Sequence, residues 1–202
     1  MSQYSQFRRR LKVDRMRRLG SGQNLLLQSN TFETSWTLVN ASVAQKSVAD
    51  AYGETLGCAL SEDDTAAANH GISQAVTVAV GDTLILSAEV KAVNRSFLDL
   101  AIIQSTNNGF QFFNLSTQAA GAHGDGVEET WVQDMGNGYY RYSIRVTATQ
   151  TSVTCRIYIA EADNDFTFSG LNQVSLHIAR AQLSKDRWPI AYVETTTAAV
   201  VP

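Results

Sequence analysis

In the stretch YRYSIRVTAT, residues 140–149, large apolar side chains alternate with polar ones. Tyrosine, isoleucine and valine occupy the even positions from 140 to 146, and arginine, serine and threonine occupy the odd positions from 141 to 147. A period of two residues is typical of an antiparallel strand that packs one face and exposes the other to water. The stretch therefore predicts a half-buried β-strand.

The same alternation recurs on both sides of this stretch. It is found in DTLILSAEVKAV (82–93), which places Leu84, Leu86, Ala88 and Val90 on one face, and in VTCRIYIAEAD (153–163). Further strands are expected in NLLLQ (24–28), SWTLVNASV (35–43), SQAVTVAV (73–80), FLDLAIIQ (97–104), FQFFNL (110–115), TWVQDM (130–135) and NQVSLHIARAQL (172–183). Turn sequences such as VGDT and GNG separate them, and no convincing helix follows residue 24. About ten such strands predict an all-β fold, an antiparallel β-sandwich of the jelly-roll type.

The N-terminus differs in charge from the rest of the chain. The chain holds 16 Lys and Arg against 19 Asp and Glu, yet seven of the cations lie between Arg8 and Arg18, with only Asp14 to offset them. This arm has a net charge of +6, and the remainder, with 9 cations and 18 anions, has −9. The Gly/Ser-containing stretch LGSGQN (19–24) is typical of a hinge. We expect a basic anchoring arm and hinge over residues 1–23 and a β-sandwich domain over 24–202.

Length and motif content exclude several classes of protein. A domain of about 180 residues buries roughly 70% of its unfolded surface, so we expect Cys58 and Cys155 to be buried and reduced, although their pairing stays open. No apolar run approaches the ~18 residues of a membrane span, and no secretory signal is expected. Nucleophile-elbow, zinc-protease and phosphate-loop motifs are absent, so we expect no enzyme, no catalytic residues and no cofactor. The acidic loops at 61–64, 123–126 and 161–165 lack calcium-loop spacing, so no metal site is expected and calcium binding stays open.

Four segments carry recognisable motifs: NLLLQSNTFETSWTLVNASV (24–43), GNGYYRYSIRVTAT (136–149), IYIAEADNDFTFSG (157–170) and SLHIARAQLSKDRWPIAYVETTTAAV (175–200). In this order they resemble a family of carbohydrate-binding-module-like jelly rolls found in bacteriophage tail-fibre and virion structural proteins. The chain departs from that family at Arg180, where a glycine usually precedes the Ala-Gln-Leu, and at Glu194, which replaces a second proline. The basic arm lies outside the resemblance.

The resemblance implies a bacteriophage virion structural protein, assembled in the host cytoplasm and most often tail-associated, as a short fibre or adaptor. A capsid decoration or cement protein on the head is the main alternative, and a soluble glycan-binding lectin is a further one. Because phage fibres of this kind are commonly trimers, a homo-oligomer is expected. Partners are then other virion proteins and a host surface glycan, with no membrane.

The arm is the candidate docking element. Arginine runs are typical of nucleic-acid tails, but the apolar residues between these cations favour an acidic protein surface as the partner, with arginine gripping carboxylates. Nucleic acid stays open as the less favoured partner. The expected docking residues are Phe7, Arg8, Arg9, Arg10, Leu11, Lys12, Arg15, Arg17 and Arg18.

Three aromatic residues are candidates for glycan binding. Sugar sites commonly set an aromatic face beside a few polar groups, and Phe110, Trp131 and Tyr139 could supply such a face. Tyr139 is expected to face outward, because adjacent strand residues point to opposite sides and Tyr140 belongs to the inward set. The alternative is that these are ordinary core or cross-strand aromatics.

Overall fold

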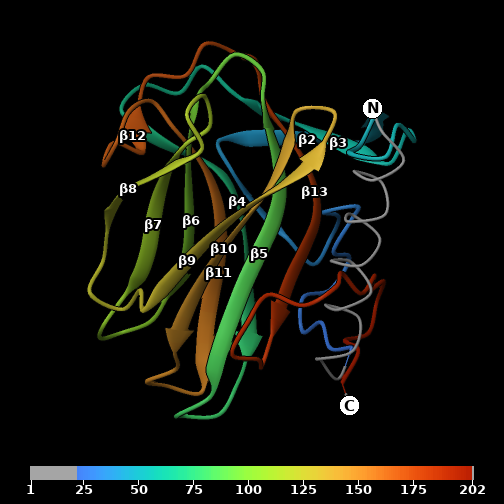
Figure 1. Ribbon diagram of the computed structural model, residues 1–202. Helices are drawn as coiled ribbons and strands as arrows, with labels where there is room; N and C mark the ends of the chain where they lie inside the picture. The colour runs from blue at the N-terminus through green and yellow to red at the C-terminus, as the bar shows by residue number, and fades with distance from the viewer. Residues whose placement is uncertain (1–21, 202) are drawn as a thin grey trace.

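Two antiparallel β-sheets packed face to face form the part of the chain that the computed structural model describes, residues 22–201 (Figure 1). The seven-stranded sheet has the order β1-β4-β11-β6-β7-β8 with β12 paired to β4, and the six-stranded sheet has the order β2-β3-β13-β5-β10-β9. The seven-stranded sheet contains β1 (Thr37–Val39), β4 (Ala68–Thr77), β6 (Phe97–Ile103), β7 (Gly109–Asn114), β8 (Ala119–His123), β11 (Ser152–Ala160) and β12 (Thr167–Phe168). The six-stranded sheet contains β2 (Ala41–Val48), β3 (Gly57–Glu62), β5 (Thr83–Ala92), β9 (Glu129–Gly136), β10 (Tyr139–Thr147) and β13 (Gln173–Ser184). The predicted all-β antiparallel sandwich is confirmed.

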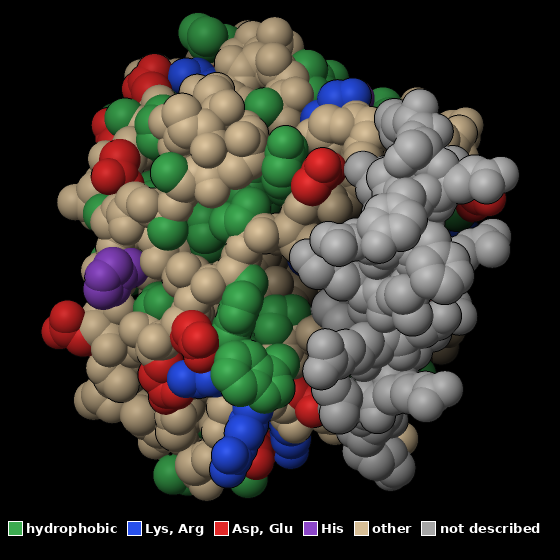
Figure 2. Space-filling model, viewed as in Figure 1, with side chains coloured by type: hydrophobic (Ala, Val, Ile, Leu, Met, Phe, Trp, Pro, Cys, Tyr) green, Lys and Arg blue, Asp and Glu red, His purple; other side chains and the backbone are tan. Residues whose placement is uncertain are grey.

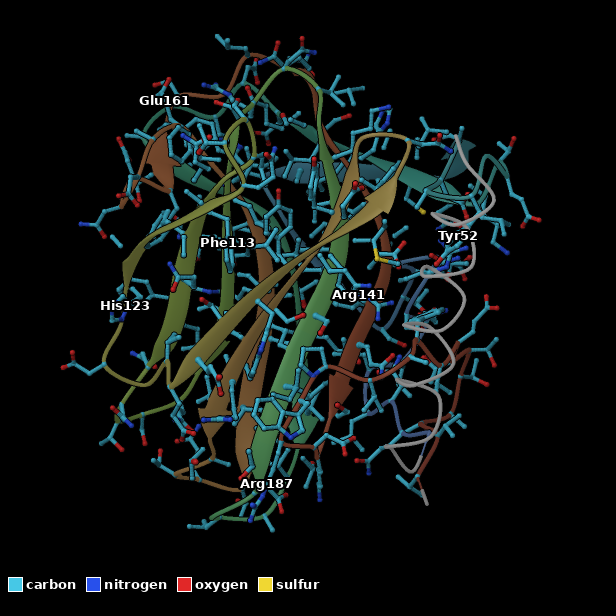
Figure 3. All side chains as sticks on the ribbon, in the orientation of Figure 1. Tyr52, Phe113, His123, Arg141, Glu161 and Arg187 are labelled. Atoms are coloured by element: carbon cyan, nitrogen blue, oxygen red, sulfur yellow. The ribbon has the colours of Figure 1, made fainter. Side chains whose placement is uncertain are left out.

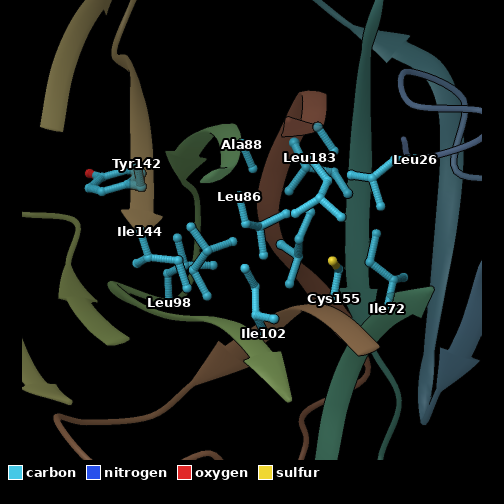
Figure 4. Close-up of a cluster of buried hydrophobic side chains, with 14 of the residues drawn as sticks. Leu26, Ile72, Leu86, Ala88, Leu98, Ile102, Tyr142, Ile144, Cys155 and Leu183 are labelled. Carbon is cyan, nitrogen blue, oxygen red and sulfur yellow. The ribbon is translucent and has the colours of Figure 1, made fainter. Parts of the chain in front are cut away.

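The core lies between the two sheets and is built from the predicted inward positions. Leu86 and Ile144 of the six-stranded sheet and Ile102 and Ile157 of the seven-stranded sheet are fully buried in one cluster, part of which is drawn in Figure 4. The buried Cys155 belongs to this cluster as well, and both cysteines are free thiols, as expected. Alternation along each strand thus directs one side of every central strand into a shared core.

The strand boundaries depart from prediction near the N-terminus. SWTLVNASV is two strands, because Asn40 adopts a φ of +43°, a left-handed conformation that asparagine tolerates. β1 before it pairs with β4 and β2 after it pairs with β3, so the chain changes sheets there. NLLLQ is a series of bends with a single bridge between Asn24 and Val200 rather than a strand. The strands β3, β8 and β12 had not been predicted.

The outer face of the six-stranded sheet is less exposed than the alternation predicts. On β5, Ile85, Ser87 and Glu89 are 1%, 5% and 0% exposed, and on β10 Arg141 and Ser143 are 6% and 1% exposed. One cause is the chain after β13, which crosses this face in front of β5 (Figure 1), and another is the ion pairing of Glu89 with Arg180, which also binds Asp50. Both faces of these central strands are therefore covered.

Asn24 ties this C-terminal segment to the sandwich. Its Nδ2 donates hydrogen bonds to the carbonyl oxygens of Ala181 (3.1 Å) and Val193 (2.8 Å). Its Oδ1 accepts hydrogen bonds from the backbone N–H groups of Leu26 and Leu183, both at 3.1 Å. The first and last of the four motif segments are thereby joined through one side chain.

Residues 1–21 and Pro202 are outside the described part, so the arm and its docking residues, Phe7 to Arg18, are not among the residues described here. Between residues 22 and 201, no helix has the length and apolar character needed to cross a membrane.

Candidate functional site

The outer face of β9 and β10 carries the side chains of the candidate site. The antiparallel register places Trp131 opposite Ser143 and Gln133 opposite Arg141. Since Tyr142 and Ile144 point into the core, these neighbouring side chains point away from it. β9 is also the edge strand of the sheet, so the site lies at its margin.

The segment over residues 185–193 forms the opposite side of the site. At its start, the Lys185 Nζ lies 2.9 Å from Asp82 Oδ2. Further along, Arg141 Nη1 donates to the Ile190 carbonyl at 3.0 Å, and the Val193 N–H donates to Gln182 Oε1 at 3.0 Å. Contacts at both ends of the segment hold its middle, residues 186–190, against the sheet.

A groove of about 290 Å³ lies between these two sides. Its apolar wall contains Trp131 and Trp188, whose ring centroids are 6.1 Å apart with 69° between the ring planes. Trp188 is 57% exposed, which is unusual for so large an apolar side chain. Figure 2 shows hydrophobic side chains gathered on this face with charged side chains directly beside them.

Two buried polar atoms in the groove lining have no hydrogen-bond partner. One is Nε of Arg141, and the other is Oδ2 of Asp186. Burial raises the pKa of Asp186 above its usual value. A buried donor or acceptor left without a partner is unfavourable, so Arg141 and Asp186 are the residues of the lining with unused hydrogen-bonding capacity.

A chain of buried ion pairs fixes the Arg141 guanidinium. Arg141 Nη2 lies 3.0 Å from Glu89 Oε1, Glu89 Oε2 lies 3.2 Å from Arg180 Nη1, and Arg180 Nη2 lies 2.6 Å from Asp50 Oδ2. Burial acts to raise the pKa of Asp50, but hydrogen bonds from Tyr52 and Arg180 outweigh it and lower that pKa. Arg141, labelled in Figure 3, is thus held in one orientation on the outer face.

The Arg145 guanidinium packs against the ring of Trp131. Its guanidinium carbon lies 5.9 Å from the centre of the Trp131 ring, within cation–π range. Its Nε donates to Glu128 Oε2 at 3.0 Å and its Nη1 lies 2.6 Å from Glu129 Oε2. The same Nη1 donates to the Arg187 carbonyl at 3.3 Å, so Arg145 links the wall to the C-terminal segment.

Of the three predicted glycan-binding aromatics, the structure places only Trp131 in this groove. Tyr139 lies on the outer side of its strand, with the Lys91 Nζ 5.8 Å from its ring centre, but it is fully buried and its hydroxyl donates to the Ala49 carbonyl at 2.9 Å. The expectation of an exposed Tyr139 is therefore wrong, because the turn after β2 covers it. Phe110 lies on β7 of the other sheet, where its ring meets that of Phe112 edge-on.

Sequence reasoning missed Trp188, Asp186 and Arg141. Trp188 and Asp186 lie in the irregular stretch KDRWPI, and Arg141 had been assigned to a solvent-exposed face. The available signal was the tryptophan before a proline, since large apolar residues in a turn-rich segment have no strand to bury them. Trp188 and Asp186 lie near Trp131 only because the C-terminal segment crosses the sheet. No local sequence pattern predicts that crossing.

A second hollow beside β4 is a weaker candidate. It has a volume of about 430 Å³ and is lined by Leu25, Leu27 and Gln74, among others. The Gln74 amide is already used by the Leu27 backbone, accepting from its N–H at 2.7 Å and donating to its carbonyl at 3.1 Å. This hollow offers apolar surface but no unpartnered buried side-chain atom from the described residues.

Carboxylates of two of the acidic loops, 61–64 and 161–165, are used internally. Glu62 binds Arg95 and Asp163 Oδ1 accepts from the Ala122 N–H at 2.8 Å. Over residues 22–201, no group of three or more His, Cys, Asp or Glu side chains is arranged to hold a metal ion.

No protein-family model matches the chain, and no curated protein matches it. Three solved structures are similar over much of the chain. The enzymatically active domain of bacteriophage CBA120 tailspike protein 4 is 15% identical, with 79% of this chain and 21% of that chain covered and a TM-score of 0.44. The Clostridium thermocellum endo-1,4-β-D-xylanase 10B CBM22-1–GH10 modules, complexed with xylohexaose, are 11% identical, with 85% and 29% covered and a TM-score of 0.43.

The third is a Bacteroides thetaiotaomicron protein described as sugar binding, 14% identical, with 81% of this chain and all of that chain covered and a TM-score of 0.39. The present chain spans less than a third of the length of the first two structures.

Proposed function

We propose that the sandwich is a carbohydrate-binding domain and that the groove between Trp131 and Trp188 is its sugar site. The observation that carries the proposal is the combination of an open tryptophan wall with two unpartnered buried polar atoms, Arg141 Nε and Asp186 Oδ2. A sugar ring has an apolar face for an aromatic side chain and hydroxyl groups that both donate and accept hydrogen bonds. A sugar would therefore place an apolar face against the tryptophans and offer hydrogen-bond partners to Arg141 and Asp186.

Binding without hydrolysis fits the groove better than catalysis. Glycoside hydrolysis ordinarily uses two carboxyl groups that flank the scissile bond. Among the described residues that line the groove, Asp186 is the only carboxylate, and the nearby Glu128 and Glu129 are paired with Arg145. We therefore propose a binding module and not an enzyme.

A glycan array probed with the full chain tests the sugar site. We expect saturable binding to a subset of glycans, reduced at least tenfold by Trp131→Ala or Trp188→Ala, because each change removes part of the aromatic wall. The matched control is Phe110→Ala, an aromatic deletion on the opposite sheet, which should bind like the wild type. Wild-type affinity in both tryptophan variants, or loss of binding only in Phe110→Ala, would refute the assignment.

We further propose that the domain belongs to a bacteriophage virion, tail-associated in preference to head-associated. The support is the resemblance of four ordered segments to phage virion jelly rolls and the separation of charge, +6 over the arm and −9 over the remainder. A cationic arm and an acidic domain suit two different partners, the particle and the outside. Immunogold microscopy of intact particles, with an antibody against residues 24–202, would place the protein on the tail, on the head, or on neither.

A further inference from the structure

Three of the cations around the groove, Arg141, Arg145 and Lys185, are paired with carboxylates. Arg141 is paired with the fully buried Glu89 at 3.0 Å, and Lys185 is paired with Asp82 at 2.9 Å. Arg145 faces two carboxylates, Glu128 and Glu129. These three cations therefore carry no surplus positive charge toward a ligand, and the exposed Arg187, which is not among the described lining residues, has no carboxylate partner among the described residues.

The anionic group of the groove has no such partner. Asp186 forms no ion pair among the residues that the structure describes, and its Oδ2 is buried without a hydrogen bond. The exposed Arg187 comes next in the chain, but it is not part of the groove lining. A ligand carboxylate or phosphate placed here would meet an uncompensated negative charge in surroundings that screen charge less than water does.

An uncharged sugar ring has the hydroxyl groups that Asp186 and Arg141 of the groove lining would need as partners. One hydroxyl can donate to Asp186 Oδ2, and the same or a neighbouring hydroxyl oxygen can accept from Arg141 Nε. The contact with Asp186 favours a neutral polyol over an anion, because a hydroxyl group can donate to the carboxylate and an ionised carboxylate or phosphate oxygen cannot. The groove volume of about 290 Å³ lies at the lower end of ligand pockets, which span about 300–1,000 Å³, and this size suits a single ring.

We infer that the groove selects one uncharged sugar ring, such as a neutral or N-acetylated hexose, and discriminates against uronic, sialic and phosphorylated sugars through Asp186. This inference rests on the proposed function, since it specifies the ligand class of the same site. Asp186 then acts as the specificity-determining residue, and the two tryptophans supply affinity that is indifferent to ligand charge.

Matched neutral and acidic probes test the selectivity. The full chain is titrated with glucose- and galactose-terminated oligosaccharides and with the same oligosaccharides ending in glucuronate or galacturonate, at low salt. We expect at least tenfold weaker binding of the acidic member of each pair. Asp186→Asn should reduce that difference severalfold, because the amide keeps an acceptor but removes the charge, while the exposed Asp125→Asn should leave it unchanged.

The outcomes separate the two proposals. Equal or tighter binding of acidic probes, still lost in Trp188→Ala, would overturn the charge selection and leave the sugar site standing. An unchanged preference in Asp186→Asn, with the thermal unfolding midpoint preserved, would overturn the role of Asp186. Binding of no glycan at all on the array would overturn the proposed function, and the inference with it.

Discussion

Glu62 and Asp99 are both fully buried carboxylates, but their surroundings differ. Burial acts to raise the pKa of Glu62, but hydrogen bonds from Arg95 and Ser175 outweigh it and hold that pKa below its usual value. Neither carboxylate oxygen of Asp99 has a hydrogen-bond partner, and burial raises its pKa to about 7 although Arg156, 3.6 Å away, opposes the shift. Equal burial therefore has opposite consequences for the two groups.

We expect Asp99→Asn to stabilise the protein at alkaline pH. A carboxyl group whose folded pKa is raised contributes most to stability below its unfolded pKa of 3.8, and that contribution is lost as pH rises to about 7. The wild-type free energy of unfolding should therefore fall between about pH 4 and pH 7, by up to about 4 kcal/mol for three pKa units. Urea unfolding across pH 4.5–8.5 should show this slope in the wild type and in the control Asp64→Asn. The slope should be absent from Asp99→Asn, and its persistence there would contradict the assignment.

Arg180 shows why some residue-level features escape prediction. It is the position where the resembled family usually has glycine, and its φ is +50°, in the left-handed region that favours glycine. Its backbone N–H donates to Asn30 Oδ1 at 2.9 Å, and its side chain binds Asp50 and Glu89. The departure was visible in the sequence, but its purpose, holding the ion-pair chain that fixes Arg141, depends on three distant segments.

At the scale of single elements, period-two alternation predicted the inward faces of β5, β10 and β11 correctly. It could not predict the outer faces, because Arg141 there is covered by the C-terminal segment and Glu89 is enclosed by Arg180, which binds Asp50 of the turn after β2. Element ends were also less predictable. Asn40 and the bends after Asn24 interrupt apolar runs that read as continuous strands.

The two sides of β11 should respond differently to truncation. Ile157 is fully buried between the sheets, so Ile157→Ala should lower the free energy of unfolding by about 2–5 kcal/mol, through lost burial and a residual cavity. Thr154 lies on the opposite side of the same strand and is partly exposed. The change Thr154→Ala should therefore lower the free energy of unfolding by less than about 1 kcal/mol. Urea unfolding of both variants measures the contrast, and Ile157→Asp should prevent folding. Similar losses for Ile157→Ala and Thr154→Ala would contradict the assigned strand orientation.

At the scale of the whole molecule, the candidate site exists because the C-terminal segment packs against strands from the middle of the chain. Trp131 lies in the middle of the sequence, while Trp188 and Asp186 lie near its end, and the side-chain bonds of Asn24 tie that end to the start of the sandwich. The fold class could be predicted from local alternation. The groove could not, since it depends on long-range crossing, and only one of its two tryptophans was identified in advance.

The charge separation between arm and domain leads to a whole-molecule prediction. If the arm anchors the protein to a particle through its cations, changing Arg8, Arg9 and Arg10 to glutamate reverses three charges and turns the arm's net +6 into zero. We expect this variant to fold and bind glycan as the wild type does, because the described residues of the groove lining all lie between Trp131 and Ile190. It should, however, lose co-sedimentation with virions assembled in the absence of the native protein. The matched control changes the same three residues to lysine, which keeps the charge but removes the arginine fork. If the lysine variant still co-sediments with virions, positive charge alone is sufficient for anchoring. If both variants are lost from the virions, the contact depends on bidentate arginine pairing. Full co-sedimentation of the glutamate variant would refute anchoring by the arm.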